Sequence, residues 1–171
     1  MDRDLELAFL SMSDVIITVS SLEKDEISQL LPTSKVHTIG HVMYPDKITK
    51  TNFRERNGIL FLAAFHGGMY YNGDAIWYFL KHIYPLVLRD TPIPLTIAGK
   101  GIPDELYTIV KNTASLTDHV TFVESATAIE PLYEKTRLLI APHLYGAGIQ
   151  YKVQSLLHVQ SLSIIYYTPH S

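Results

Sequence analysis

The sequence predicts an α/β fold, a Rossmann-like parallel sheet with helices on both faces. Apolar runs of strand length alternate with segments of helical period along most of the 171 residues. Strands joined by helical crossovers form parallel sheets. Small-residue or turn-forming loops follow several of the apolar runs, and ligands bind outside the carboxyl ends of the strands in such sheets. We expect four loops to meet at that edge: 67–68, 99–101, 124–128 and 146–152.

The first 44 residues predict a helix, a strand, a second helix and a second strand. The opening helix spans Asp4–Met12, and the β-branched run Val15–Val19 predicts a short buried strand. Ser20 precedes an acidic segment, which is typical of a helix N-terminus. Lys35–Ile39 predicts the second strand. Residues 45–57 are polar and have no clear period, so we interpret them as a hinge or linker.

A regular α/β series follows in residues 58–171. Apolar runs predict strands at 58–64, 94–98, 119–123, 137–142 and 162–166. Apolar residues at helical spacing predict a helix that Asp74 caps and that runs to about Arg89. Pro103 predicts the first turn of another helix. Two further helices are expected at 129–135 and 149–159.

Composition excludes several functions. The net charge is −3 and there is no basic run, so nucleic acid is not an expected partner. The absence of cysteine excludes disulfides and thiolate chemistry. The charged N-terminus is unlike a signal peptide, and no apolar stretch reaches the roughly 20 residues that cross a bilayer. We therefore expect a cytoplasmic protein, with a peripheral place at the inner membrane face left open.

The most informative stretch lies near the C-terminal end. A predicted buried strand ends at Pro142, a loop holding Gly146 and Gly148 follows, and a helix start brings Lys152 into its first turn. A strand, a glycine loop and a helix leave backbone N–H groups pointing at one spot, which suits a phosphate or diphosphate. The lysine ammonium can neutralise the same anion. Turn glycines and a solvated lysine are the plainer alternatives.

Other motifs favour plainer interpretations. Gly67 and its neighbour fit a flexible loop better than a phosphate cradle. His37 and His41 lack a carboxylate partner, so a metal site is not expected. His143, at the carboxyl end of a strand, fits a structural hydrogen bond better than a ligand contact.

Successive landmarks of the chain resemble family 4 glycosyltransferases, which are GT-B enzymes built from two Rossmann-like domains. The most specific is Ile140–Pro142 followed by Gly146–Val153, and the resemblance extends over nearly the whole chain. The other landmarks are Ser13–Ser20 with Glu23, Phe61, Asn72–Phe79, Ile83–Leu86, Leu95–Gly99 and Pro131–Tyr133.

The resemblance implies the C-terminal donor domain of a retaining enzyme that uses a nucleotide-diphosphate sugar and no metal. Gly146 and Gly148 would lie against the diphosphate, and Lys152 would pair with its charge. The turn Glu124–Ala128 would approach the nucleobase through its backbone. Residues 1–44 would be the tail of the N-terminal domain, and 58–171 a donor domain incomplete at its C-terminus.

Three positions depart from the family pattern. Ser155 stands where the family usually has a glutamate that grips the ribose, and serine cannot supply a charge-assisted bond. Ala147 stands where a second glutamate is often found. The loop Phe65–Tyr71 has no lysine or arginine to share the phosphate charge, which leaves His66 as its candidate.

The acceptor is expected to be a growing polysaccharide or a glycolipid. A GT-B enzyme needs two domains of roughly 150–200 residues each, so this chain is expected to be truncated and inactive alone. An incomplete sheet edge would favour self-association. The alternative is a degenerate, non-catalytic module that binds nucleotide weakly or only a protein partner. A nucleotide-sugar epimerase would need acid and base carboxylates that we do not identify.

Overall fold

A computed structural model describes residues 3–40, 51–66 and 71–143 and the backbone of the strand 163–166. These residues fall into two compact units, one holding 3–40 and the other holding the described residues from 51 onward. Each unit is described by itself.

The first unit contains two helices and a parallel two-stranded sheet. Its elements are α1 (Arg3–Ser11), β1 (Ile16–Thr18), α2 (Ser21–Leu30) and β2 (Val36–Thr38). Ser20 caps α2 as predicted, because its side chain accepts a hydrogen bond from the Glu23 N–H at 3.1 Å.

The prediction of a buried strand at Val15–Val19 is wrong in part. Ile16 is buried, but the side chain of Ile17 is 61% exposed and that of Val15 is exposed as well. The reason is the period of two in a strand, which sends alternate side chains to opposite faces. A β-branched run therefore identified the strand without showing that only one face of it is covered.

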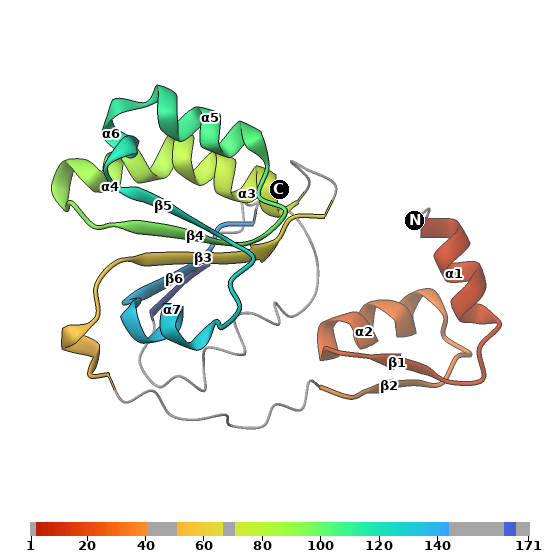
Figure 1. The fold of residues 1–171 in the computed structure, drawn as a ribbon. Coiled ribbons are helices and arrows are strands. Elements are labelled where there is room, and N and C mark those ends of the chain that lie inside the picture. The colour runs from red at the N-terminus through yellow and green to blue at the C-terminus, as the bar shows by residue number, and fades with distance from the viewer. Residues whose placement is uncertain (1–2, 41–50, 67–70, 144–162, 167–171) are drawn as a thin grey trace. The chain divides into compact units, whose positions relative to one another are not determined.

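The second unit is built on a five-stranded parallel sheet in the order β5-β4-β3-β6-β7 (Figure 1). Its strands are β3 (Ile59–Ala64), β4 (Leu95–Lys100), β5 (Val120–Glu124), β6 (Leu138–Ala141) and β7 (Ser163–Tyr166). A short 3-10 turn, Phe53–Glu55, precedes β3. The predicted strands are all present, and β4 extends two residues further than expected, through Gly99 and Lys100.

Helices cover both faces of this sheet (Figure 1). One face carries α3 (Asn72–Tyr78), α4 (Tyr84–Asp90), α5 (Asp104–Asn112) and the short α6 (Ala114–Thr117), and the other carries α7 (Glu130–Lys135). The predicted α/β class, a Rossmann-like parallel sheet with helices on both faces, is confirmed.

Three details of the helices differ from the prediction. Asp74 lies in the first turn of α3 but does not cap it, because Tyr71 holds the cap position with φ 35° and makes no side-chain cap bond. Pro103 is likewise the residue before α5, with extended backbone, and not its first turn. A π-helical turn, Phe79–Ile83, joins α3 to α4. The spacing of apolar residues predicts a helix but could not show that one turn of it is π-helical.

The core of the second unit fills the space between β3, β4 and the helices that pack on them. Phe61 and Leu80 are fully buried there, as is the side chain of Tyr84. Leu106 and Val110 of α5 are also buried in this core.

Tyr84 joins three segments through its hydroxyl. That group donates to the Ile93 carbonyl at 2.6 Å and lies 3.2 Å from the His119 carbonyl, so it ties the start of α4 to the segments that enter β4 and β5. Burial raises the pKa of this phenol to about 12. The buried hydroxyl is therefore protonated and bonded at neutral pH.

We expect Tyr84→Phe to lower the free energy of unfolding by about 1 kcal/mol at pH 8, because buried carbonyl groups lose a hydrogen-bond donor. The phenol titrates near 10 when unfolded and at about 12 when folded, so its contribution is present below pH 10 and is lost as the pH rises toward 12. Urea unfolding at about pH 8 and pH 11 measures this. The difference between variant and wild type should shrink at the higher pH; a difference that grows would contradict the assignment.

Candidate functional site at the carboxyl edge of the sheet

The strand order places a topological switch between β3 and β6. From β3 the chain continues to β4 on one side, whereas β6 and β7 are added on the other. Open α/β sheets bind ligands outside the carboxyl ends of their strands at such a switch point, so we place the candidate site at the loops that leave β3 and β6. The described residues of these loops are 65–66 and 71 after β3, and 142–143 after β6.

His143 is the last described residue of the loop after β6. It is 2% exposed, and its Nε2 lies 3.0 Å from the Asn72 side-chain oxygen. The Asn72 amide nitrogen donates to the Ala64 carbonyl at 2.8 Å, so its oxygen is the atom that faces the histidine. It follows that Nε2 carries the proton in this arrangement. The ring also stacks on Tyr71, with centroids 4.6 Å apart.

These contacts join the ends of two strands that the switch point separates. Asn72 begins α3 and also bonds the last residue of β3, while His143 follows β6. The structural hydrogen bond expected for His143 is present. The sequence analysis missed Asn72 as its partner, because 71 positions separate the two residues. An asparagine directly before a helical period was the one available signal.

A second cluster lies where β4 and β5 end. The Glu124 carboxylate accepts hydrogen bonds from the N–H groups of Gly101 at 2.7 Å and Ile102 at 3.2 Å. The bond from Gly101 holds the pKa of the Glu124 carboxyl below its ordinary value, with smaller contributions from Ile102 and Ser125 and a partial opposing effect of desolvation. The side chain stays ionised at neutral pH and fastens the loop that follows β4.

Two of the candidate site residues, Glu124 and His66, lie within the described part of the chain. Glu124 lies at the carboxyl edge, as expected for the turn that it begins. His66 is exposed at the end of β3. The remaining predicted residues, Gly67, Gly146, Gly148, Lys152 and Ser155, lie outside the described residues, as does the predicted helix 149–159.

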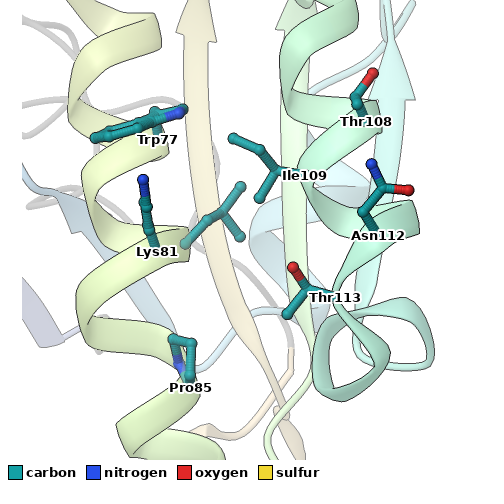
Figure 2. Close-up of a pocket in the computed structure, with 8 residues that line it drawn as sticks. Trp77, Lys81, Pro85, Thr108, Ile109, Asn112 and Thr113 are labelled. Atoms are coloured by element: carbon teal, nitrogen blue, oxygen red, sulfur yellow. The ribbon is translucent and has the colours of Figure 1, made fainter.

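A separate cavity of about 280 Å³ lies on the helical face, between the α3–α4 run and α5 (Figure 2). Trp77 and Lys81 form one wall, with the ammonium 4.5 Å from the indole centroid, and Ile109 and Asn112 belong to the other. None of its lining residues belongs to the loops at the carboxyl edge. This cavity is therefore distinct from the candidate site at the carboxyl edge.

Within the described ranges, no group of three or more histidine and acidic side chains is arranged to hold a metal ion. In the same part of the chain, no helix combines the length and the apolar character needed to cross a membrane.

The family model of the group 1 glycosyl transferases matches residues 61–161, which begin in β3 and include the described residues of the candidate site. The chain belongs to this family. A Klebsiella pneumoniae relative, described as an "uncharacterized 44.6 kDa protein in cps region", is 30% identical over 135 residues. That match covers 72% of this chain and 33% of the relative. This group 1 glycosyltransferase chain therefore spans about a third of that relative's length.

Solved structures show the same fold at low sequence identity. TarM has a TM-score of 0.77 and 12% identity, and the match covers 95% of this chain and 31% of TarM. Sucrose-phosphate synthase of Thermosynechococcus elongatus has a TM-score of 0.71 and 15% identity, covering 95% of this chain and 43% of that chain. The pneumococcal O-GlcNAc transferase GtfA, solved with UDP and GlcNAc, has a TM-score of 0.65 and 15% identity. The match covers 98% of this chain and 33% of the GtfA chain. The fold of this group 1 glycosyltransferase chain is thus that of GT-B glycosyltransferases.

Proposed function

We propose that this chain forms the donor-binding part of a retaining, family 4 glycosyltransferase that moves a sugar from a nucleotide-diphosphate sugar to an acceptor. The observation that carries the proposal is the topological switch point of a parallel sheet, in a chain of the group 1 family. Two proteins of the same fold, TarM and GtfA, were solved with UDP. In this proposal residues 1–44 end the N-terminal domain, 45–57 form the hinge and 58–171 bind the donor.

The binding chemistry is assigned to the loop after β6 and the helix expected beyond it. Gly146 and Gly148 lie against the diphosphate, and Lys152 neutralises the charge that builds on it as the sugar departs. Stabilising the leaving group in this way needs no metal, and such preorganised charge is commonly the largest single contribution to catalysis. Ser155 takes the ribose in place of the usual glutamate, and Gly67 allows the loop after β3 to approach the phosphates.

The proposal also covers the acceptor and the place of the enzyme in the cell. The acceptor is proposed to be a glycan or glycolipid, in the synthesis of a polysaccharide. The proposed place of the enzyme is the cytoplasm, with peripheral contact at the inner membrane face. The chain alone is expected to have little activity, because the acceptor would bind to a second domain.

We expect Lys152→Ala to weaken nucleotide-diphosphate binding by about 1.5–3 kcal/mol, the scale of a hydrogen bond to a charged group. Calorimetric titration of the 171-residue chain with UDP, GDP and ADP measures this and also names the base. Lys111→Ala is the matched control, because Lys111 is an exposed lysine near the end of α5. Equal affinity of wild type and Lys152→Ala would refute the assignment of the diphosphate site.

The second candidate function is a non-catalytic module that has kept the donor fold. Ser155 favours it, because the ribose loses a charge-assisted partner. A folded chain that binds none of the three nucleotides would support this alternative. Size-exclusion chromatography then tests self-association through an open sheet edge, with a monomer counting against it.

A further inference from the structure

Glu124 lies at the junction of three loops, and its carboxylate faces the protein's own backbone. The strand pairing of β4 and β5 ends at Gly99 and Glu124. Just beyond that pair, the Glu124 oxygens accept hydrogen bonds from Gly101 N–H at 2.7 Å and from Ile102 N–H at 3.2 Å. Bonds from two successive N–H groups to one carboxylate fix the direction of a loop backbone more firmly than a single contact would.

The loop that Glu124 holds is pressed against the loop after β3. Gly101 has φ 74°, a conformation that suits glycine, and a Cβ at this position would lie 2.8 Å from the Phe65 carbonyl oxygen. The Phe65 N–H also donates to the Lys100 carbonyl at 2.9 Å. Any shift of Gly101 is therefore passed directly to Phe65, the residue before exposed His66.

The loop after β5 is fastened to the same place. Ser125 follows Glu124 with φ 49°, and its N–H donates to the Gly99 carbonyl at 2.7 Å. A positive φ is unusual outside glycine and persists where the surroundings enforce it. The loops after β3, β4 and β5 thus share one network of backbone bonds, and Glu124 is the side chain that closes it.

The side chain of Ile102 is the second attachment that holds the loop after β4, in addition to the Glu124 carboxylate. The Ile102 side chain is 7% exposed and belongs to the hydrophobic core of the unit. The segment 101–102 is thereby held in two ways: Ile102 packs in the core, and the Glu124 carboxylate accepts hydrogen bonds from the backbone. Neither attachment uses a residue of the loop after β6, to which the diphosphate is assigned.

We propose that Glu124 is a positioning residue of the nucleotide site, whose carboxylate holds Gly101 and Ile102 so that three loops present a fixed edge to the ligand. The inference rests on the proposed function, because it assumes that a nucleotide binds at this edge. It goes beyond the expectation that the turn Glu124–Ala128 approaches the base through its backbone. Here the Glu124 side chain acts on the nucleotide indirectly, by holding the loop after β4.

The test uses Glu124→Gln, with Glu105→Gln as the matched control. The glutamine oxygen can accept one of the two bonds, but its NH₂ group is a donor and cannot accept the other. Glu105 is an exposed glutamate in the first turn of α5, so its substitution makes the same chemical change away from the network. Glu124→Asp is a third variant that keeps the charge on a shorter side chain.

Two properties are measured on the 171-residue chain: amide hydrogen exchange by NMR, and the affinity for UDP, GDP and ADP. In Glu124→Gln we expect exchange at Gly101 or Ile102 to accelerate about tenfold or more, because a hydrogen bond to a charged group is lost. We expect the affinity for the preferred nucleotide to fall about three- to tenfold. In Glu124→Asp we expect exchange rates and affinity between those of wild type and Glu124→Gln. Glu105→Gln should change neither the exchange rates nor the affinity.

The outcomes separate the two proposals. Lys152→Ala should lower affinity while leaving exchange at Gly101 and Ile102 as in wild type, whereas Glu124→Gln should change both. Unchanged exchange in Glu124→Gln would overturn the inference, and so would faster exchange with unchanged affinity. If wild type binds none of the three nucleotides while exchange still responds to Glu124→Gln, the proposed function fails and Glu124 has a purely structural role.

Discussion

Replacing Gly99 with alanine is expected to destabilise the five-stranded unit by about 3 kcal/mol or more. Gly99 lies in β4, paired in register with Ala63 of β3. A Cβ built at Gly99 would overlap the Ala63 carbonyl oxygen, and it would also lie 2.9 Å from that carbonyl carbon and 3.2 Å from the Phe65 ring. A flexible side chain could move aside, but the obstacle is the backbone of the central strand.

Urea unfolding followed by tryptophan fluorescence measures this loss. The chain has one tryptophan, Trp77 in α3, which packs against the core of the second unit and so reports on it. Lys100→Ala is the control, because it introduces the same residue one position further along β4, where the side chain is exposed. We expect it to stay within about 0.5 kcal/mol of wild type. A Gly99→Ala chain as stable as Lys100→Ala would show that β3 and β4 separate at no cost.

Phe61→Ala is expected to cost about 3–5 kcal/mol, the range for removing a buried phenylalanine. Phe61 is fully buried in the central strand β3. Its ring lies 6.2 Å from that of Phe65 and 6.5 Å from the His143 imidazole, centroid to centroid. The cavity left by the substitution would thus open near the His143 ring, so the local order of His143 should fall together with the global stability.

The same fluorescence experiment measures the stability, and NMR of the His143 ring measures the local effect. Phe122→Ala provides the comparison, because Phe122 lies half-buried on β5, which has one described neighbour, β4. It should lose clearly less stability and leave the His143 signals unchanged. Equal losses in the two variants would mean that the core is not centred on β3.

The sequence predicted the elements of the second unit well, because each one depends on local chemistry. The runs that became β3, β4 and β6 are short, apolar and bounded by turn residues, and a buried parallel strand needs little else. The helical run that became α3 and α4 followed from apolar residues at helical spacing. Ser20 was recognised as a cap because its bond to Glu23 spans three residues.

The predictions that failed depended on what lay across space. Asp74 has the chemistry of a cap, but Tyr71 holds that position, while Asn72 is engaged by Ala64 and His143. Ile17 has the composition of a buried strand residue, but no described element of the first unit covers it. Local sequence preferences could not predict the cap position or the exposure of Ile17, because both depend on neighbours that are distant in the chain.

The sequence by itself determined the α/β class, the order of the described elements and the edge at which the loops after β4 and β5 lie. Hydrophobic period and turn residues encode all three within windows of a few residues. Only the tertiary structure decided that β3 stands at the centre of the sheet, that His143 meets Asn72, and that Glu124 bonds to Gly101 and Ile102. These contacts join positions that only the folded sheet brings together, and a hydrogen bond depends on distance and direction rather than on composition.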